Sequence, residues 1–183
     1  MTTDVTMAGF GGQGILMIGN LLSIAAMEEG KHVTYFPAYG VEMRGGTANC
    51  TVVISDEEIG SPVIGHPAAC VVMNGPSLDK YLSLIKPGGH LLINRSLVDP
   101  AKVVRDDLSV LAVPANDVAR DVIGSQQLAS MVALGAYVAA TGVVAMSALI
   151  ACLPKVVSKK YEKFIPLNVK ALQEGESFAR HHA

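Results

Sequence analysis

The chain has 183 residues, with 14 Lys and Arg against 16 Asp and Glu and a formal net charge of −2. This length predicts a single domain over residues 1–183. The lack of a long basic run or zinc-ligand spacing, together with few aromatic residues, argues against nucleic-acid binding. Half the residues are hydrophobic and the mean hydropathy is +0.40. We therefore expect a subunit that covers part of its surface with partners and self-associates when isolated.

Strands are predicted at residues 4–8, 32–36, 47–55, 68–73, 90–94 and 108–113. Helices are predicted at 15–29, 76–85, 117–123, 126–140, 147–158 and 166–174. This alternation predicts an α/β fold, specifically a three-layer α/β/α sandwich with a mostly parallel, Rossmann-like sheet. The order of the strands cannot be read from the pattern.

Residues 128–153 contain no charged side chain and are long enough to span a bilayer. Thr141-Gly142 reads as the end of one helix, and Ser147 as a cap of the next. We therefore expect a pair of buried helices and no membrane span. The N-terminus lacks a basic region followed by an apolar core, so no signal peptide is expected.

The three cysteines, Cys50, Cys70 and Cys152, are odd in number and widely spaced. They suit buried thiols in a reducing, cytoplasmic compartment. They also lack the close spacing of iron–sulfur ligands, so a cluster would belong to another chain. No metal site is expected in this one.

The first glycine-rich segment, residues 9–14 (GFGGQG), lies between a predicted strand and a predicted helix. Gly9, Gly11 and Gly14 match the dinucleotide fingerprint, and Gly12 and Gln13 complete the loop. Gly11 is expected to provide close backbone approach or a positive φ, and Gln13 a polar tip that faces either a ligand or water. Backbone N–H groups at such a helix start attract an anion. The next strand lacks the acid that binds ribose and the arginine that binds a 2′-phosphate, which disfavours NAD(P) and FAD. A phosphate-bearing ligand such as coenzyme A and plain close packing both remain open.

The second segment, residues 39–46 (YGVEMRGG), follows the next predicted strand. Arg44 offers a planar fork of donors for a phosphate or a partner carboxylate, and Glu42 would orient it or reach a neighbouring subunit. Tyr39 offers a stacking face. Alternatively, Glu42 and Arg44 are an ordinary surface pair, and Gly45-Gly46 is only a turn.

Both glycine segments should lie at the carboxyl edge of neighbouring strands in a parallel sheet, where such folds bind ligands. Asn74 and Ser77 follow the fourth strand to the same edge, although a helix start explains them equally well. The sequence contains no Ser-His-Asp order, Walker A lysine motif or H-E-x-x-H. No catalytic residue is therefore assigned to this chain.

The blocks GFGGQG, PAYGVEMRGGTANC, SDEEIGSPVI, VVMNGPSLDKY and KPGGHLLIN together resemble the gamma subunit of 2-oxoacid:ferredoxin oxidoreductases over nearly the whole chain. The block YGVEMRGGTANC is the part most specific to this family. Its sequence is more similar to the 2-oxoglutarate and branched-chain types than to the pyruvate type. Many relatives carry proline where Val41 stands, a change that affects loop stiffness more than chemistry.

The resemblance implies a complex that oxidatively decarboxylates a 2-oxoacid, forms an acyl-coenzyme A and passes electrons to ferredoxin. Thiamine diphosphate, Mg²⁺ and iron–sulfur clusters would belong to partner subunits. This chain would pack on the thiamine-bearing subunit, help to bind coenzyme A, and be inactive alone. Two alternatives stay open: a stand-alone, Rossmann-like nucleotide-dependent oxidoreductase, and a structural subunit that binds no ligand.

Overall fold

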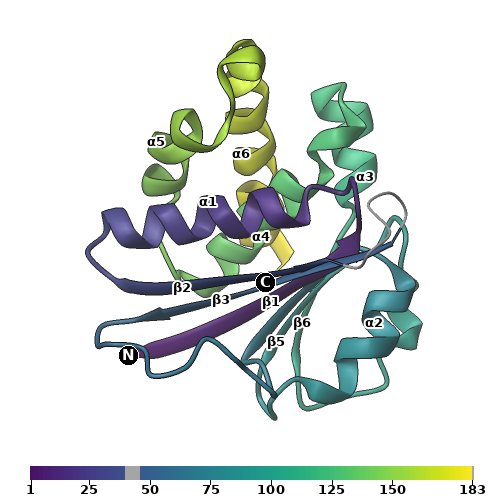
Figure 1. The fold of residues 1–183 in the computed structure, drawn as a ribbon. Coiled ribbons are helices and arrows are strands. Elements are labelled where there is room, and N and C mark those ends of the chain that lie inside the picture. Colours follow the sequence, from purple (N-terminus) through teal and green to yellow (C-terminus); the bar gives the residue numbers. More distant parts are fainter. Residues whose placement is uncertain (40–45, 183) are drawn as a thin grey trace.

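The computed structural model describes residues 1–39 and 46–182, which form a six-stranded mixed sheet with helices on both faces (Figure 1). Its order is β2-β3-β1-β4-β5-β6, where the strands are β1 (Thr2–Phe10), β2 (His32–Tyr39), β3 (Thr47–Ser55), β4 (Ala69–Val72), β5 (His90–Asn94) and β6 (Ser109–Val113). The pairings β1–β4, β4–β5 and β5–β6 are parallel, whereas β3 is antiparallel to both β1 and β2. The predicted α/β class and mostly parallel sheet are confirmed, but this pairing differs from the Rossmann order 3-2-1-4-5-6.

The position of β3 corrects one expectation about the two glycine segments. β1 and β2 run in the same direction, so their carboxyl ends do share one edge of the sheet, but β3 lies between them. The two strands are therefore not neighbours. β3 enters the sheet at the same edge because it forms a hairpin with β2, and Tyr39 pairs with Ala48 in the register of that hairpin.

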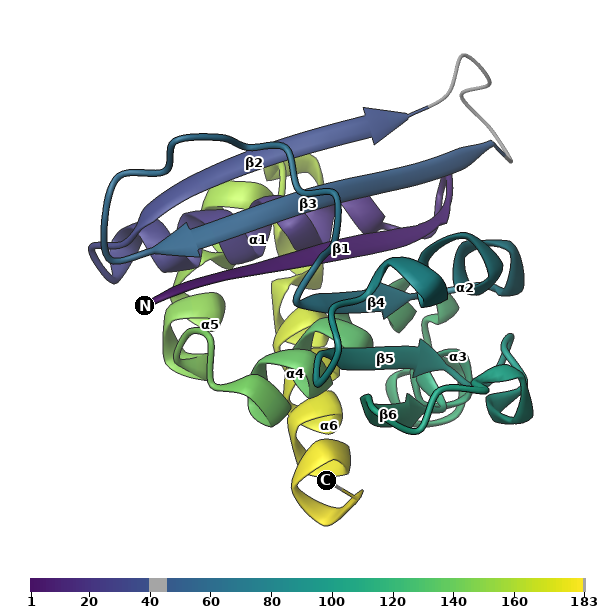
Figure 2. The ribbon, with the colours of Figure 1, turned by 90° about the horizontal axis from the view of Figure 1, so that it is seen from below.

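The helices are α1 (Ile15–Glu28), α2 (Gly75–Tyr81), α3 (Ala115–Val118), α4 (Ala129–Thr141), α5 (Met146–Val156) and α6 (Ile165–His182). Figure 1 shows α1, α4, α5 and α6 on one face of the sheet and α2 on the other. Seen from below, α2 lies beside β4, while no described helix covers β2 and β3 on that side (Figure 2). The expected sandwich is thus strongly unequal, with a large core on the first face and a small one under α2.

The uncharged stretch proves to be two helices, of which α4 is buried as expected, whereas α5 buries only Leu149, Cys152 and Leu153. Gly142 ends α4 with a positive φ of 64°, as the Thr141-Gly142 signal predicted. The expected cap is wrong, since Ala145 occupies the N-cap position of α5 and Ser147 lies inside the helix. α4 lies between the sheet and α6, and it is buried on every side from Ala129 to Val138. Within the described ranges, no helix combines the length and apolarity that crossing a membrane requires.

Two glycines set the spacing between α4 and α6. A Cβ atom at Gly135 would lie 2.1 Å from the backbone oxygen of Leu172, and one at Gly175 would lie 2.0 Å from that of Val132. Only glycine permits backbones to approach so closely. The path of α6 against α4 therefore depends on both positions.

β2 forms one edge of the sheet, and it carries Pro37 near its carboxyl end. Pro37 lies opposite Cys50 of β3 in the register of this pair. Because proline has no N–H, it fits an edge strand where its nitrogen faces away from the neighbouring strand. The neighbouring Phe36 is 50% exposed and lines a shallow hollow together with Thr51 of β3 and Val63.

Candidate functional site

The first glycine segment forms a tight turn between β1 and α1. Gly12 and Gly14 have positive φ values of 94° and 79°, which L-residues with side chains rarely adopt. The sequence predicted close backbone approach or a positive φ at Gly11. Gly11 is not among the positive-φ glycines of the described residues, and its close approach to a ligand stays a prediction. Gly9 lies inside β1, where a Cβ would crowd the Gln13 and Ile15 side chains. Close packing thus explains Gly9, whereas backbone conformation explains Gly12 and Gly14.

The structure joins the first glycine segment to the end of the second. The N–H of Gly11 donates to the backbone oxygen of Gly46 over 2.8 Å. This bond occupies the Gly11 donor, so a ligand would have to use other N–H groups of the turn. Glu42, Arg44 and Gly45 lie outside the described residues, as does the side chain of Tyr39.

Gln13 connects two strand ends and does not reach outward, an arrangement that neither sequence-based alternative included. Its Oε1 accepts from the Phe10 N–H at 2.7 Å and from Asn74 Nδ2 at 3.1 Å, and its Nε2 donates to the Met73 oxygen at 3.5 Å. Asn74 is buried and accepts from the Ser77 N–H at 2.9 Å, which makes it the N-cap of α2. The helix-start interpretation of Asn74 therefore describes its main contact.

A groove of about 600 Å³ lies along the glycine turn and the start of α1. Described residues line it from three elements: Phe10, Gly11, Gly12, Gly14, Ile15, Leu16, Met17, Gly46, Thr47 and Ala48. The N–H groups of Ile15, Leu16 and Met17 have no hydrogen-bond partner among the described residues, as expected for the first turn of a helix. None of the described lining residues is charged, so the positive potential that these residues supply comes from backbone N–H groups and the α1 dipole.

A second hollow of about 210 Å³ opens on the other side of the turn, between the carboxyl ends of β1 and β4. The connections leave these two strands toward opposite faces, which is where open α/β sheets bind ligands. Its polar lining consists of carboxamides, namely Gln13, Asn116, Gln126 and Gln127. Sequence reasoning missed this set, although Asn94 at the end of a strand was a usable signal.

Asn94 holds in place Asn116, one of the carboxamide residues that line this second hollow. It is fully buried, and its Nδ2 donates to Asn116 Oδ1 at 2.6 Å and to the Met73 oxygen at 3.4 Å. The Oδ1 of Asn94 has no hydrogen-bond partner within the described ranges. The amides at the ends of β4, β5 and β6 therefore form one connected network.

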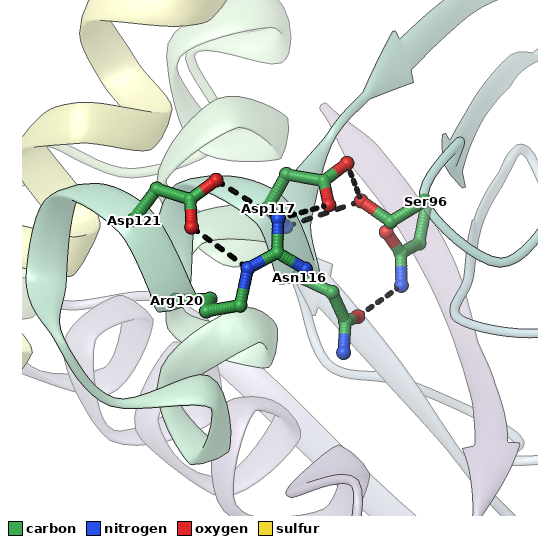
Figure 3. A network of polar contacts seen from close by, with 6 residues as sticks. Ser96, Asn116, Asp117, Arg120 and Asp121 are labelled. Carbon is green, nitrogen blue, oxygen red and sulfur yellow. Dashed lines mark hydrogen bonds and ion pairs between the residues drawn. The ribbon is translucent and has the colours of Figure 1, made fainter.

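Next to this network, Figure 3 shows Arg120 held between Asp117 and Asp121. Arg120 bonds Asp121 through two nitrogens, at 2.7 and 2.8 Å, and Asp117 at 3.0 Å, while Ser96 donates to Asp117 at 2.7 Å. Asp121 and Asp117 raise the pKa of Arg120, and Arg120 in turn lowers the pKa of Asp121. Because two carboxylates neutralise this cation, it adds little attraction for an anionic ligand.

The family model for pyruvate ferredoxin/flavodoxin oxidoreductase matches residues 4–178. The chain is 39% identical over 178 residues to ketoisovalerate oxidoreductase subunit VorA of Methanothermobacter marburgensis, covering 96% of the chain but only 36% of that protein. It is 32% identical to 2-oxoglutarate synthase subunit KorC of Methanocaldococcus jannaschii, covering 98% and 95% of the two chains. The chain thus spans about a third of VorA and nearly all of KorC.

Two solved structures have the same fold. The keto/oxoacid ferredoxin oxidoreductase gamma subunit from Geobacter sulfurreducens matches with a TM-score of 0.84 and 33% identity, covering 98% and 99% of the two chains. The 2-oxoglutarate:ferredoxin oxidoreductase from Magnetococcus marinus, with 2-oxoglutarate, coenzyme A and succinyl-CoA bound, matches with a TM-score of 0.89 and 24% identity. That match covers all of this chain and 32% of the other.

Proposed function

The chain belongs to the pyruvate ferredoxin/flavodoxin oxidoreductase family as a gamma-type subunit, and from this we propose that it helps to bind coenzyme A in a multi-subunit 2-oxoacid:ferredoxin oxidoreductase. The complex would decarboxylate a 2-oxoacid, transfer the acyl group to coenzyme A and reduce ferredoxin. The observation that carries the proposal is the groove at the glycine turn, which is lined by three residues of the first turn of α1 whose N–H groups have no partner among the described residues. Such groups suit the phosphates of coenzyme A.

The substrate would be a branched-chain 2-oxoacid or 2-oxoglutarate. The relatives VorA and KorC are named for ketoisovalerate and for 2-oxoglutarate, respectively. The sequence block around Arg44 also resembles the branched-chain and 2-oxoglutarate types. The structure of the Magnetococcus enzyme, which contains coenzyme A and succinyl-CoA, supports the presence of an acyl-coenzyme A site in such complexes. In this chain we propose that Arg44 binds a phosphate of coenzyme A, that Glu42 orients Arg44, and that Tyr39 offers a stacking face.

We assign thiamine diphosphate, Mg²⁺ and the iron–sulfur clusters to partner subunits, because the donor groups described here do not fit them. Within the described part of the chain, no three His, Cys, Asp or Glu side chains converge on a possible metal position. Burial raises the pKa of the Cys50 and Cys70 thiols to about 12, which opposes the thiolate that a cluster requires. We therefore expect the isolated chain to show no 2-oxoacid-dependent electron transfer.

Coenzyme A kinetics of the assembled complex test the proposal through Gly12. A Cβ at this exposed glycine would meet no atom within 4 Å, and asparagine and aspartate are the side-chain residues that best tolerate its positive φ. Gly12→Asp should raise the KM for coenzyme A about tenfold or more by repelling its phosphates, whereas the uncharged Gly12→Asn should have a much smaller effect. Gly88→Asp is the matched control. Gly88 also has a positive φ and open space around it, but it precedes β5 and so lies at the amino ends of the parallel strands, away from the glycine turn.

A ligand-free structural subunit is the second candidate. Two observations favour it. The side chains of Gln13 and Asn74 form hydrogen bonds within the protein. A Cβ at Gly14 would lie only 2.4 Å from Ser130 Oγ, so close packing also requires glycine there. Packing alone thus accounts for part of the motif. An unchanged coenzyme A KM in Gly12→Asp, in a complex of normal composition, would favour this second function over the first. Bound NAD or flavin in the purified chain would instead support a stand-alone oxidoreductase.

A further inference from the structure

The connection between α5 and α6 concentrates lysines and aromatic rings on the surface. We call residues Lys159–Phe164 (KKYEKF) the basic–aromatic segment; it forms a short 3₁₀ helix, and every residue in it is exposed. Tyr161 is 51% exposed and Phe164 is 41% exposed. Their ring centroids are 6.4 Å apart, so together they form one continuous apolar surface.

The lysines of this segment have no acidic ion-pair partners in the part of the chain that the structure describes. Lys159, Lys160 and Lys163 form no ion pair among the described residues. Lys160 and Lys163 instead lie over the rings of Tyr161 and Phe164, with their Nζ atoms 5.4 and 5.2 Å from the ring centroids. The lysines therefore frame the rings and leave their charges available.

The start of α6 adds to the positive potential. This helix has 18 residues and no acidic side chain in its first turn, although acidic residues are favoured there because the helix dipole is positive at that end. Three lysines precede it, and Glu162 is the single acidic residue of the segment. A chain with a net charge of −2 thus carries a local concentration of positive charge, which Glu162 offsets only in part and which no ion pair among the described residues neutralises.

We propose that the basic–aromatic segment docks against an acidic surface of another subunit of the oxidoreductase complex, with Tyr161 and Phe164 entering an apolar recess. This inference rests on the proposed function, since it requires the chain to be a subunit. Aromatic anchors surrounded by a charged rim are typical of protein interfaces. The segment lies between two packed helices and presents only two rings, whereas membrane-surface helices present a long apolar face.

Assembly with the thiamine- and cluster-bearing subunits tests this docking. Affinity of the wild-type chain should fall when salt rises from about 0.1 M to about 1 M, because the Debye length shrinks from about 10 Å to about 3 Å. The triple variant Lys159→Glu, Lys160→Glu, Lys163→Glu should bind about tenfold more weakly or worse, from three lost pairs of modest strength and the added repulsion. Tyr161→Ala should weaken binding at both salt concentrations.

Lys80→Glu is the matched control for Lys160→Glu. Lys80 is exposed, and its Nζ lies 5.0 Å from the centroid of the Tyr81 ring, but it belongs to α2 on the opposite face of the sheet. Lys160→Glu should weaken assembly, and Lys80→Glu should leave it unchanged. Circular dichroism should give the same melting curve for each variant and the wild type, because the side chains are exposed.

The outcomes separate the two proposals. Failure of the wild-type chain to assemble would overturn the proposed function itself. Assembly of the wild type and the triple variant with equal affinity would overturn the docking proposal alone. Binding of the wild-type chain to phosphatidylserine vesicles, lost in the triple variant while subunit assembly stays normal, would show that the segment serves a lipid surface and would also overturn it.

Discussion

Replacing Gly135 with alanine tests the close contact between the backbones of α4 and α6. The added Cβ would lie 2.1 Å from the Leu172 oxygen, and such contacts are essentially never shorter than 3.0 Å. The two backbones must therefore separate by about 0.9 Å, the difference between these distances. No side-chain rotation relieves the clash, because the atoms it meets first belong to the backbone of α6.

The expected cost follows from two opposing terms. A gap of 0.5–1 Å forfeits a quarter to a half of the dispersion energy across it, and overpacking typically costs about 1–3 kcal/mol. Alanine recovers about 1 kcal/mol through its higher helix propensity. With the overpacking cost at its upper end, we expect the free energy of unfolding to fall by about 2 kcal/mol. For a chain of this size, that corresponds to a decrease in Tm of about 4–8 °C.

Urea and thermal unfolding of Gly135→Ala, Gly175→Ala and Gly75→Ala provide the assay. Gly75 begins α2, and a Cβ there would meet nothing within 4 Å, so its alanine variant should be at least as stable as the wild type. The two interface variants should lose stability by similar amounts. A Gly135→Ala protein with wild-type Tm would refute the reasoning, since α4 and α6 could not then be as close as described.

Three smaller tests address other parts of the molecule. Asn74→Ala should lower the free energy of unfolding by about 1 kcal/mol, because it removes the N-cap of α2; equal urea midpoints would contradict this. Cys50 and Cys70, whose pKa burial raises to about 12, should react with a maleimide near neutral pH only after denaturation. Contact with the Lys31 ammonium lowers the pKa of the Asp56 carboxyl from 3.8 to about 2. The ionised Asp56 therefore contributes its full stabilisation above pH 3.8, and this stabilisation is lost as the pH falls toward 2. Carboxyl NMR titration should show this low midpoint and its return toward 3.8 in Lys31→Met.

The local structure of this chain was largely predictable from sequence. All six strands formed close to the predicted ranges, because apolar runs and period-two patterns mark buried strands directly. The alternation in residues 47–55 placed Ala48, Cys50, Val52 and Ile54 in the main core, as strand geometry requires. The break at Gly142 was equally visible, because glycine supplies the positive φ that ends α4.

Features that depend on distant contacts were not predictable in the same way. A single sequence gives no strand order, so the insertion of β3 between β1 and β2 was missed, along with the uneven distribution of helices. Gln13 looked like an outward-facing tip because its partner Asn74 is 61 residues away. The positive φ at Gly12 was not predicted, since the fingerprint fixes the spacing of a turn but not which residue takes the positive φ.

Pro37 on the edge strand has a consequence for the tendency of the chain to aggregate. An edge strand normally offers a row of outward N–H and C=O groups on which a second chain can build a further strand, a first step toward aggregation. In β2 that row lacks a donor at Pro37, which interrupts any long, regular pairing along the edge. The chain is thereby protected on this side from fibre-like association, while its sheet faces and helices stay free to form other contacts.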